Sequence, residues 1–277
     1  MAILRSQITG MNFHYVKYTF EYFLDSMVKH QFQNIEVWGG APHFYLEDLT
    51  LVDIRRVKQA IDSRGLKVVC FTPEQCMYPI NIAAKEERMR NRSILYFKKA
   101  MDVAVEIGAP MVLVTVGSGY YNEMPSGAWN RAVDALHELV AYAEKVGVML
   151  ALEPLQRCES DVIHRVSTLS LMIQTVNSPM LKGMLDTVAT ASVGDELESY
   201  FEVLGDDLVH MHFIDGNPTG HLVWGDGNLP LERYLEILKR YDYQGALTLE
   251  IGGSRYFVDP DMATKRSLKQ LDRYLID

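Results

Sequence analysis

Four side chains able to bind a metal ion stand at the ends of four successive apolar runs in the second half of the chain. They are Glu153 in ALEP, Asp186 in MLDT, His212 in HMHFID and Glu250 in LTLEIG. The intervals between them are 33, 26 and 38 residues (186−153, 212−186 and 250−212), about the length of one strand and the helix that follows it. A charged group at the end of a run that folding should bury requires a chemical reason.

A shared divalent cation supplies that reason, because three carboxylates brought together without one would repel each other strongly. Three carboxylates and one imidazole suit a hard ion, so Mn²⁺, Mg²⁺ or Co²⁺ is preferred over a metal that selects thiolates. A single carboxylate at a strand end is often a loop cap or a surface ion-pair partner, but four such ends in succession favour a metal site. His210 and His212 share a strand face, and we expect His212 to be the ligand and His210 to form hydrogen bonds below it.

Eight apolar, β-branched runs recur along the chain and are expected to be strands. They span residues 3–9, 34–39, 66–72, 111–117, 148–154, 181–187, 208–215 and 245–252. The segments between them have helical periodicity, and several end at a glycine, as at Gly65, Gly108 and Gly147. This alternation predicts a single (β/α)8 TIM-barrel domain over residues 1–277, with its active site at the carboxyl ends of the strands. A doubly wound open sheet is the alternative, but SQITGMNF is a poor match to the glycine-rich turn of that fold.

The composition excludes several classes of partner. A net charge of −9 argues against a nucleic-acid partner, which would require a basic surface. No membrane partner is expected, because no apolar run approaches the roughly 20 residues that span a bilayer and the first ten residues lack the features of a secretion signal. The three cysteines, Cys70, Cys76 and Cys158, are odd in number and lack C-x-x-C spacing, so a disulfide framework is not expected. We therefore expect a cytoplasmic protein.

Longer motifs around the four predicted ligands resemble the sugar isomerases and epimerases of the xylose-isomerase-like barrels. These motifs are LALEPLQRCES (150–160), GMLDT (183–187), HMHFIDG (210–216), GHLVWGDGNLP (220–230) and GALTLEI (245–251). The ketose 3-epimerases within that group share the same set of four ligands. In the first half of the chain, IEVWGGAPHFY (35–45) and FTPEQCMYPIN (71–81) resemble the fructoselysine 3-epimerases. The resemblance covers nearly the whole chain, and its metal motifs are more specific than its first-half motifs.

The resemblance implies roles for individual residues. One divalent metal ion would be held by Glu153, Asp186, His212 and Glu250, with Mn²⁺ preferred and Mg²⁺, Co²⁺ or Zn²⁺ as alternatives. Glu153 and Glu250 would also be the catalytic acid and base. Glu159 matches a carboxylate that contacts the substrate, and His221 stands near the position where free-ketose epimerases use an arginine to hold it. The expected substrate is a small-molecule ketose or a glycated amino acid, and a homo-oligomer is expected because such relatives are commonly dimers or tetramers.

One position departs from the free-ketose epimerases. Three residues after Asp186, where they carry a sugar-contacting histidine, this chain has Ala189. The departure favours a ketose that carries a substituent, such as fructoselysine, whose C3 epimer is psicoselysine. Aromatic residues of the first-half loops are expected to line the space for the lysine part of such a substrate, with Trp38 preferred as a substrate-binding residue; they are Trp38, Phe44, Tyr45 and Tyr78.

C3 epimerisation beside a ketone passes through an enediolate that a metal ion stabilises, and inversion needs acid/base groups on both faces of the carbon. The predicted site would also serve a one-base 1,2-isomerase or another ketose 3-epimerase. An inosose-type dehydratase on the same barrel is a further alternative. An abasic-site endonuclease would need a histidine-rich, multi-metal site and a basic surface, which 8 histidines and a net charge of −9 do not fit. A non-catalytic sugar-binding module would have little reason to keep all four ligands.

Overall fold

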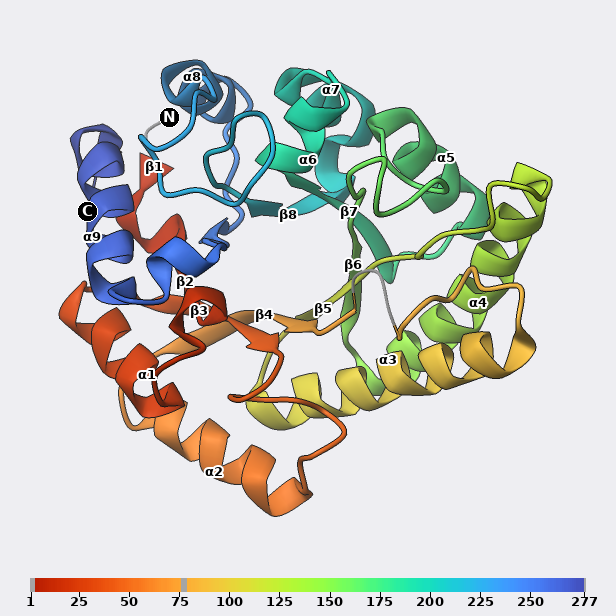
Figure 1. Ribbon diagram of the computed structural model, residues 1–277, viewed down its shortest axis with the longest axis horizontal. Coiled ribbons are helices and arrows are strands. Elements are labelled where there is room, and N and C mark those ends of the chain that lie inside the picture. Colours follow the sequence, from red (N-terminus) through yellow and green to blue (C-terminus); the bar gives the residue numbers. More distant parts are fainter. Residues whose placement is uncertain (1–2, 76–78, 277) are drawn as a thin grey trace.

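The computed structural model of the chain describes residues 3–75 and 79–276, and in it eight parallel strands close into a barrel (Figure 1). In ring order they are β2 (Ile8–Met11), β3 (Asn34–Gly39), β4 (Lys67–Pro73), β5 (Met111–Val114), β6 (Met149–Leu152), β7 (Leu181–Asp186), β8 (Leu208–His212) and β9 (Leu247–Leu249). The ring closes where β9 pairs with β2. The predicted (β/α)8 barrel is therefore confirmed.

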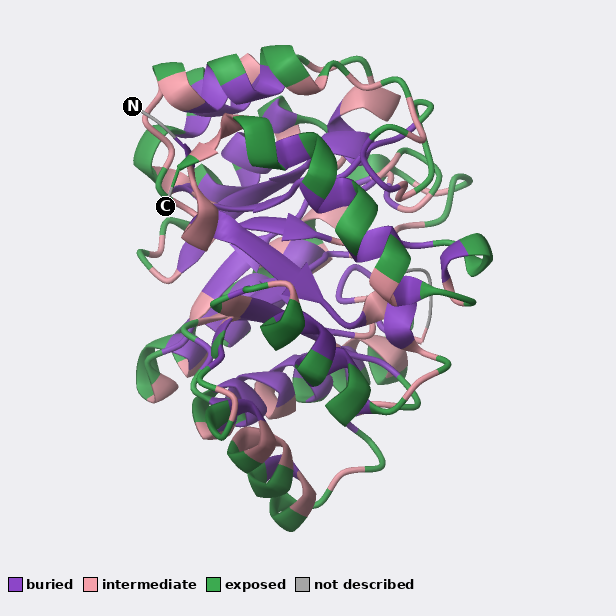
Figure 2. Cartoon of the chain, turned by 90° about the vertical axis from the view of Figure 1, so that its left-hand side faces the viewer, coloured by how far each residue is buried: buried purple, intermediate pink, exposed green. Residues whose placement is uncertain are grey.

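Helices surround the barrel and turn their apolar faces toward it (Figure 2). They are α1 (Phe20–Lys29), α2 (Leu51–Asp62), α3 (Glu87–Ile107), α4 (Pro125–Val146), α5 (Val166–Val176), α6 (Thr187–Ser192), α7 (Leu197–Leu204), α8 (Leu231–Arg240) and α9 (Pro260–Leu271). The helices α3 and α4 end at Gly108 and Gly147, which have φ angles of +76° and +73°. Glycine adopts this left-handed conformation without steric cost, so the predicted glycine stops are confirmed at both helices. Every helix within the described residues is too short or too polar to cross a bilayer.

The first barrel strand differs from the prediction over residues 3–9. The barrel strand β2 begins only at Ile8, while β1 (Ile3–Leu4) pairs outside the barrel with β10 (Leu275–Ile276). The side chain of Gln7 separates the two strands, because it accepts a hydrogen bond from the Leu4 amide (2.9 Å) and donates one to the Tyr243 carbonyl (2.7 Å). The apolar run over residues 3–9 thus contributes strands to two sheets. The hydrophobic pattern alone does not show where the first strand ends and the second begins.

Inside the barrel, side chains from four neighbouring strands form a small apolar cluster below the rim. Cys70, Leu113, Ala151 and Met184 make up this cluster and are all buried. Because strand residues alternate between faces, Ala151 lies on the same side of its strand as Glu153, and Met184 lies on the same side as Asp186. The interior is therefore filled, and the space for chemistry lies above it at the carboxyl ends of the strands.

Truncating the apolar face of an outer helix should destabilise the barrel. Leu139 of α4 is fully buried, so Leu139→Ala should lower the free energy of unfolding by about 2–5 kcal/mol through lost burial and a residual cavity. Leu171 of α5 is 54% exposed, and Leu171→Ala is the matched control, with an expected change within about 0.5 kcal/mol. Urea unfolding followed by circular dichroism measures both, and equal losses would contradict the assignment of the buried face.

Candidate metal centre

The four predicted ligands meet at the rim of the barrel. Glu153 directly follows β6, Asp186 ends β7, His212 ends β8 and Glu250 directly follows β9. The Nδ1 atom of His212 lies 3.2 Å from Glu153 Oε1, 3.8 Å from Asp186 Oδ2 and 3.0 Å from Glu250 Oε2. All four side chains are buried or nearly so. The structure therefore brings together the residues that the sequence selected as ligands.

Asp186 divides its two carboxylate oxygens between different tasks. Its Oδ1 atom caps the helix α6 by accepting hydrogen bonds from the amides of Val188 (2.6 Å) and Ala189 (2.8 Å). Its Oδ2 atom is buried and finds no hydrogen-bond partner within residues 3–75 and 79–276. A buried oxygen without a partner is costly, and this one faces the imidazole of His212. The cap fixes the carboxylate so that its free oxygen points into the cluster.

A buried carboxylate that sequence reasoning missed lies behind His212. Glu36 of β3 contacts His212 Nε2 through Oε1 (3.0 Å) and His210 Nε2 through Oε2 (2.8 Å), and it also accepts a hydrogen bond from the Thr72 hydroxyl. Because Glu36 engages Nε2 of His212, the Nδ1 atom is left for a ligand role, an arrangement typical of metal-binding histidines. His210 forms the expected hydrogen bond below the rim.

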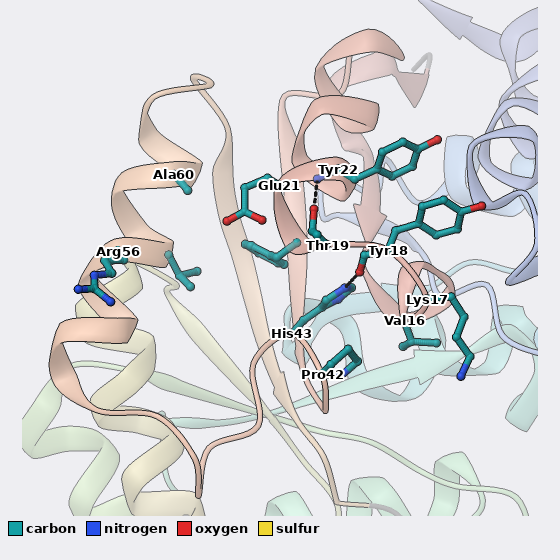
Figure 3. A pocket seen from close by; sticks show the side chains of 12 residues that line it. Val16, Lys17, Tyr18, Thr19, Glu21, Tyr22, Pro42, His43, Arg56 and Ala60 are labelled. Atoms are coloured by element: carbon teal, nitrogen blue, oxygen red, sulfur yellow. Dashed lines mark hydrogen bonds between the residues drawn. The ribbon is translucent and has the colours of Figure 1, made fainter.

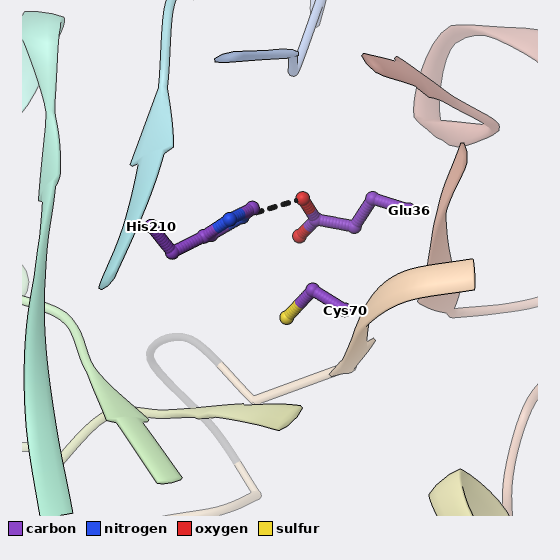
Figure 4. Close-up of side chains that lie close together, drawn as sticks. All are labelled: Glu36, Cys70 and His210. Atoms are coloured by element: carbon purple, nitrogen blue, oxygen red, sulfur yellow. Dashed lines mark hydrogen bonds and ion pairs between the residues drawn. The ribbon is translucent and has the colours of Figure 1, made fainter. Parts of the chain in front are cut away.

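Cys70 lies beside Glu36 and His210, so these three residues could also form a metal-binding group (Figure 4). However, both oxygens of Glu36 are already engaged by imidazoles. Burial raises the pKa of the Cys70 thiol well above its usual value, and a thiol binds a metal only as the thiolate. We therefore assign this cluster to the support of His212.

The charges of the cluster shift its pKa values in different directions. Burial raises the pKa of Glu153 to about 7, although His212 opposes the shift. Burial acts on Glu250 in the same direction, but His212 and His221 outweigh it and bring its pKa to about 2. Burial lowers the pKa of His212, but the charges of Glu250, Glu36 and Glu153 prevail and hold it well above its usual value. The buried carboxylates of the cluster therefore favour the binding of a positive charge, whether a proton or a metal ion.

His221, predicted as a substrate contact, lies against Glu250. Its Nδ1 atom is 3.0 Å from Glu250 Oε2, and 27% of its side chain is exposed. Burial lowers the pKa of His221, but Glu250 outweighs it and raises the value to about 10. The loop that carries His221 is anchored to the strand β9 end, because the His221 carbonyl accepts a hydrogen bond from the Gly252 amide (2.8 Å).

Asp215 organises the same loop and was not selected from the sequence. Its buried carboxylate accepts hydrogen bonds from four backbone amides, those of Gly216 (2.8 Å), Gly225 (2.9 Å), Gly227 (2.8 Å) and Leu229 (3.0 Å). A side chain that satisfies this many amides holds a long loop in one conformation. The only sequence signal was an aspartate followed by a glycine-rich segment, which is also typical of an ordinary turn.

The other residues predicted to contact the substrate differ in burial and in what they pack against. Glu159 is half-buried, and burial raises its pKa although a hydrogen bond from the Gln156 amide (3.1 Å) opposes the shift. The charges of His221, Asp186 and Glu250 also act on this pKa, so Glu159 belongs to the same electrostatic neighbourhood. Trp38 is half-buried in β3. Phe44 is fully buried and packs on Phe71, so its predicted role in lining the substrate space is wrong, because the apolar core encloses it.

Tyr45 lines a surface pocket against α3 rather than the metal centre, and Tyr78 lies outside the described residues. A second pocket, of about 770 Å³, lies between α1 and α2 (Figure 3). Its lining includes Tyr18, Tyr22 and His43 but none of the four predicted ligands. The imidazole of His43 is held there by the Tyr18 carbonyl (2.8 Å), so we assign no chemistry to this pocket.

The donor set of the rim fits one divalent cation. Ligand atoms of Glu153, Asp186 and His212 lie within 4.8 Å of one another, and the same holds for Asp186, His221 and Glu250. The partnerless Oδ2 atom of Asp186 and the Nδ1 atom of His212, which makes no hydrogen bond of good geometry within the described residues, are the atoms that a cation would satisfy. Oxygen donors with one imidazole favour Mn²⁺ or Mg²⁺ over thiolate-seeking metals.

Known proteins similar to this chain include sugar epimerases. The model of the xylose isomerase-like TIM barrel family matches residues 24–274. Fructoselysine 3-epimerase of Escherichia coli O157:H7 is 32% identical over 241 residues, which cover 86% of this chain and 87% of that protein. D-psicose 3-epimerase of Enterocloster bolteae is 28% identical over 209 residues, which cover 70% of this chain and 67% of that protein.

Two solved structures share the fold at lower identity. D-psicose 3-epimerase from Clostridium cellulolyticum H10, determined with D-tagatose, matches with a TM-score of 0.78 and 19% identity over 98% of this chain and 99% of that chain. The 3-keto-D-glucoside 4-epimerase of Escherichia coli matches with a TM-score of 0.82 and 20% identity over 97% of this chain and 100% of that chain. At these identities the likeness shows the fold alone.

Removing the negative charge behind His212 should weaken metal binding. In Glu36→Gln the amide can accept a hydrogen bond from only one of the two imidazoles, so we expect the dissociation constant for Mn²⁺ to rise about 10–100-fold. Calorimetric titration of chelator-treated protein measures this change, with exposed Glu144→Gln as the control. An unchanged affinity would show that Glu36 does not position His212.

Metal binding should also weaken as the pH falls. Glu153 has a pKa of about 7 in the metal-free protein, so it takes up a proton between pH 8 and pH 6, and a bound cation must displace that proton. We expect the dissociation constant for Mn²⁺ to rise by about tenfold per pH unit for each proton displaced. Calorimetry at pH 6, 7 and 8 tests this expectation, and a constant affinity across that range would contradict it.

Proposed function

The chain belongs to the xylose isomerase-like TIM barrel family, and from that membership we propose that it catalyses the metal-dependent epimerisation of a ketose at C3. Its relatives named above are carbohydrate isomerases of the epimerase type, and the chain is an enzyme of that class. Within the proposal the substrate is fructoselysine or a similar C1-substituted ketose, the product of fructoselysine is psicoselysine, and the enzyme works in the cytoplasm as a homo-oligomer.

The observation that carries the proposal is the convergence of three carboxylates on Nδ1 of His212. Glu153 and Glu250 approach this nitrogen at 3.2 and 3.0 Å from strand ends that are not neighbours in the ring. A binding module would gain nothing from burying so much like charge, whereas an enzyme that stabilises a developing anion needs a cation at that point.

A bound divalent ion would supply Lewis acidity that stabilises the negative charge of an enediolate. The residues that would hold it are Glu153, Asp186, His212 and Glu250. The chain itself must move the proton at C3. Glu153 follows β6 and Glu250 follows β9, so the two carboxyl groups approach the centre from different sides of the mouth. One carboxylate removes the C3 proton from one face and the other carboxylic acid returns a proton to the opposite face, which inverts the carbon.

Two further residues would orient the reaction. His221 lies 3.0 Å from the Glu250 carboxylate and holds it in place. Glu159 shares the electrostatic environment of the cluster and would contact a hydroxyl of the sugar. The presence of Ala189, buried at the position where free-ketose epimerases carry a histidine, removes one polar contact to the sugar chain. These features, together with 32% identity to fructoselysine 3-epimerase, support a substituted ketose as the substrate.

Deuterium exchange tests the proposed reaction directly. Fructoselysine incubated with the protein and Mn²⁺ in deuterated water should acquire deuterium at C3 and give psicoselysine, both visible by nuclear magnetic resonance. D-psicose and D-fructose are tested in parallel as free ketoses. Exchange at C1 with formation of an aldose would identify a 1,2-isomerase. Loss of water from an inosose, without epimerisation of any ketose, would identify a dehydratase instead.

Replacing either proposed acid/base group should stop turnover without unfolding the protein. We expect Glu250→Gln and Glu153→Gln each to reduce kcat by about 10³-fold or more, because the amide neither accepts nor delivers the C3 proton. Circular dichroism and Mn²⁺ affinity report the fold and the metal centre separately. Glu198→Gln, at a carboxylate that pairs with Arg240 outside the site, is the control. Activity that survives in either site variant would remove that residue from the mechanism.

A further inference from the structure

The carboxylate of Glu74, which the proposed mechanism does not use, lies on the side of the barrel mouth opposite the ligand-bearing strands. Glu74 directly follows β4 and is half-buried. Side chains alternate along a strand, and in β4 both Cys70 and Thr72 point into the barrel, where Thr72 contacts Glu36. Glu74 follows Thr72 by two residues, in the bend where the chain leaves β4 at the level of the rim.

Trp38 belongs to the neighbouring strand β3. It lies two residues after the inward-facing Glu36, and β3 and β4 pair in a register that sets Trp38 opposite Thr72 and Gly39 opposite Pro73. The indole N–H of Trp38 lies close enough to the Glu74 carboxylate to lower its pKa. Trp38 is therefore level with Thr72, and Glu74 follows Thr72 by two residues toward the rim.

The backbone on both sides of this pair is held by buried amide side chains. The side chain of Asn12 accepts a hydrogen bond from the Trp38 amide (2.7 Å) and donates one to the Trp38 carbonyl (3.1 Å). Gln75 donates to the Pro73 carbonyl (3.1 Å) and accepts from the Thr115 amide (2.8 Å). The ring of Trp38 also lies against Gly40, where an added Cβ would approach it to 2.0 Å. The structure therefore fixes where this pair stands.

A wall of side chains connects the pair to the metal centre. The ring of Phe13 packs against Trp38 with centroids 4.9 Å apart. Phe13 and His221 meet at Gly252. A Cβ added to Gly252 would lie 3.1 Å from the ring of Phe13 and 3.1 Å from the Cβ of His221. Since His221 contacts Glu250, Trp38 and the ligand cluster line one continuous surface. A sugar bound at the cluster would meet this wall.

The charge of Glu74 has no positively charged partner among the residues that the structure describes. It forms no ion pair with any residue in the ranges 3–75 and 79–276, and the indole that contacts it is a neutral donor. Burial raises the pKa of Glu74, the nearby indole N–H of Trp38 opposes the shift, and the charge of Glu250 adds to it. A partly buried carboxylate without a cation bears a desolvation cost, so a ligand that brings a cation would be bound favourably here.

We propose that Glu74, oriented by the indole of Trp38, binds the ammonium group that a C1-amino ketose carries beside its ketone, and thereby selects such substrates over free ketoses. The inference rests on the proposed function, because it concerns the substituent on the carbon next to the reacting ketone. A free ketose has a neutral hydroxyl at C1 and cannot neutralise the carboxylate. A C1-amino ketose carries a protonated amine there, whose charge-assisted hydrogen bond to Glu74 is the stronger contact.

The experiment uses 1-amino-1-deoxy-D-fructose as the aminated probe and D-fructose as the neutral one, with the Mn²⁺-loaded protein. Binding is measured by calorimetry, and C3 exchange is measured in deuterated water. Glu74→Gln should weaken binding of the aminated probe about 30-fold, as expected for loss of one partner of a partly buried charge pair. Binding of D-fructose should change by less than about threefold. Trp38→Phe, which keeps the ring and loses the N–H donor, should weaken the aminated probe by a smaller factor.

The control is Glu47→Gln, which removes an exposed carboxylate from the loop after β3 and should leave both probes unaffected. Mn²⁺ affinity should be the same in the unmodified protein and in Glu74→Gln, which separates ligand recognition from damage to the metal centre. If the unmodified protein and Glu74→Gln bound the aminated probe equally well, the inference would be overturned. An equal loss of affinity for both probes in Glu74→Gln would overturn it as well. Binding that depends on Glu74 without any C3 exchange would support the amine site and overturn the epimerase function instead.

Discussion

The burial of three carboxylates around one imidazole nitrogen is the constraint on which the rest of the rim depends. Like charges at such distances repel strongly in a site that excludes water, so Glu153, Asp186 and Glu250 can stay together only with a positive charge between them. The helix cap on Asp186 and the contact of Glu36 with His212 direct the free oxygen and the free nitrogen toward that charge. The barrel interior below is filled by apolar side chains, which leaves the rim as the place where a cation can be reached from solvent.

The sequence predicted the barrel and its four ligand candidates because both rest on local signals. Each strand is a short apolar run, and the residue at its end is recognisable as a charge that follows buried positions, as with Glu153 after LAL. In a parallel barrel all such ends meet at one rim. The spatial cluster of Glu153, Asp186, His212 and Glu250 could therefore be deduced without knowing any tertiary contact, although their roles as ligands stay a prediction.

The missed residues depend on contacts between distant segments. Glu36 contacts His210, which is 174 residues further along the chain, and nothing near Glu36 reveals that partner. Its charge inside a buried strand was a usable signal, since the same reasoning had singled out Glu153. Asp215 gives a weaker signal, because its four amide partners become neighbours only when the loop folds. The boundary between β1 and β2 was missed for a similar reason, since the side chain of Gln7 bonds to Tyr243 in the last part of the chain.

The alternation of strand residues also separates two tasks on the same pair of strands. In β3 and β4 the side chains of Glu36 and Thr72 support His212, while Trp38 and Glu74 come two residues later in the chain, nearer the rim. A substitution at Trp38 or Glu74 is therefore expected to leave in place the contact of Glu36 with the imidazole of His212. The strands β6 to β9 carry the four predicted ligands, so the proposed chemistry and the proposed selection of substrate come from opposite sides of one ring. The relatives of this chain include epimerases of different sugars. We expect such enzymes to differ at positions like Trp38 and Glu74, because changes there leave the four-residue cluster intact.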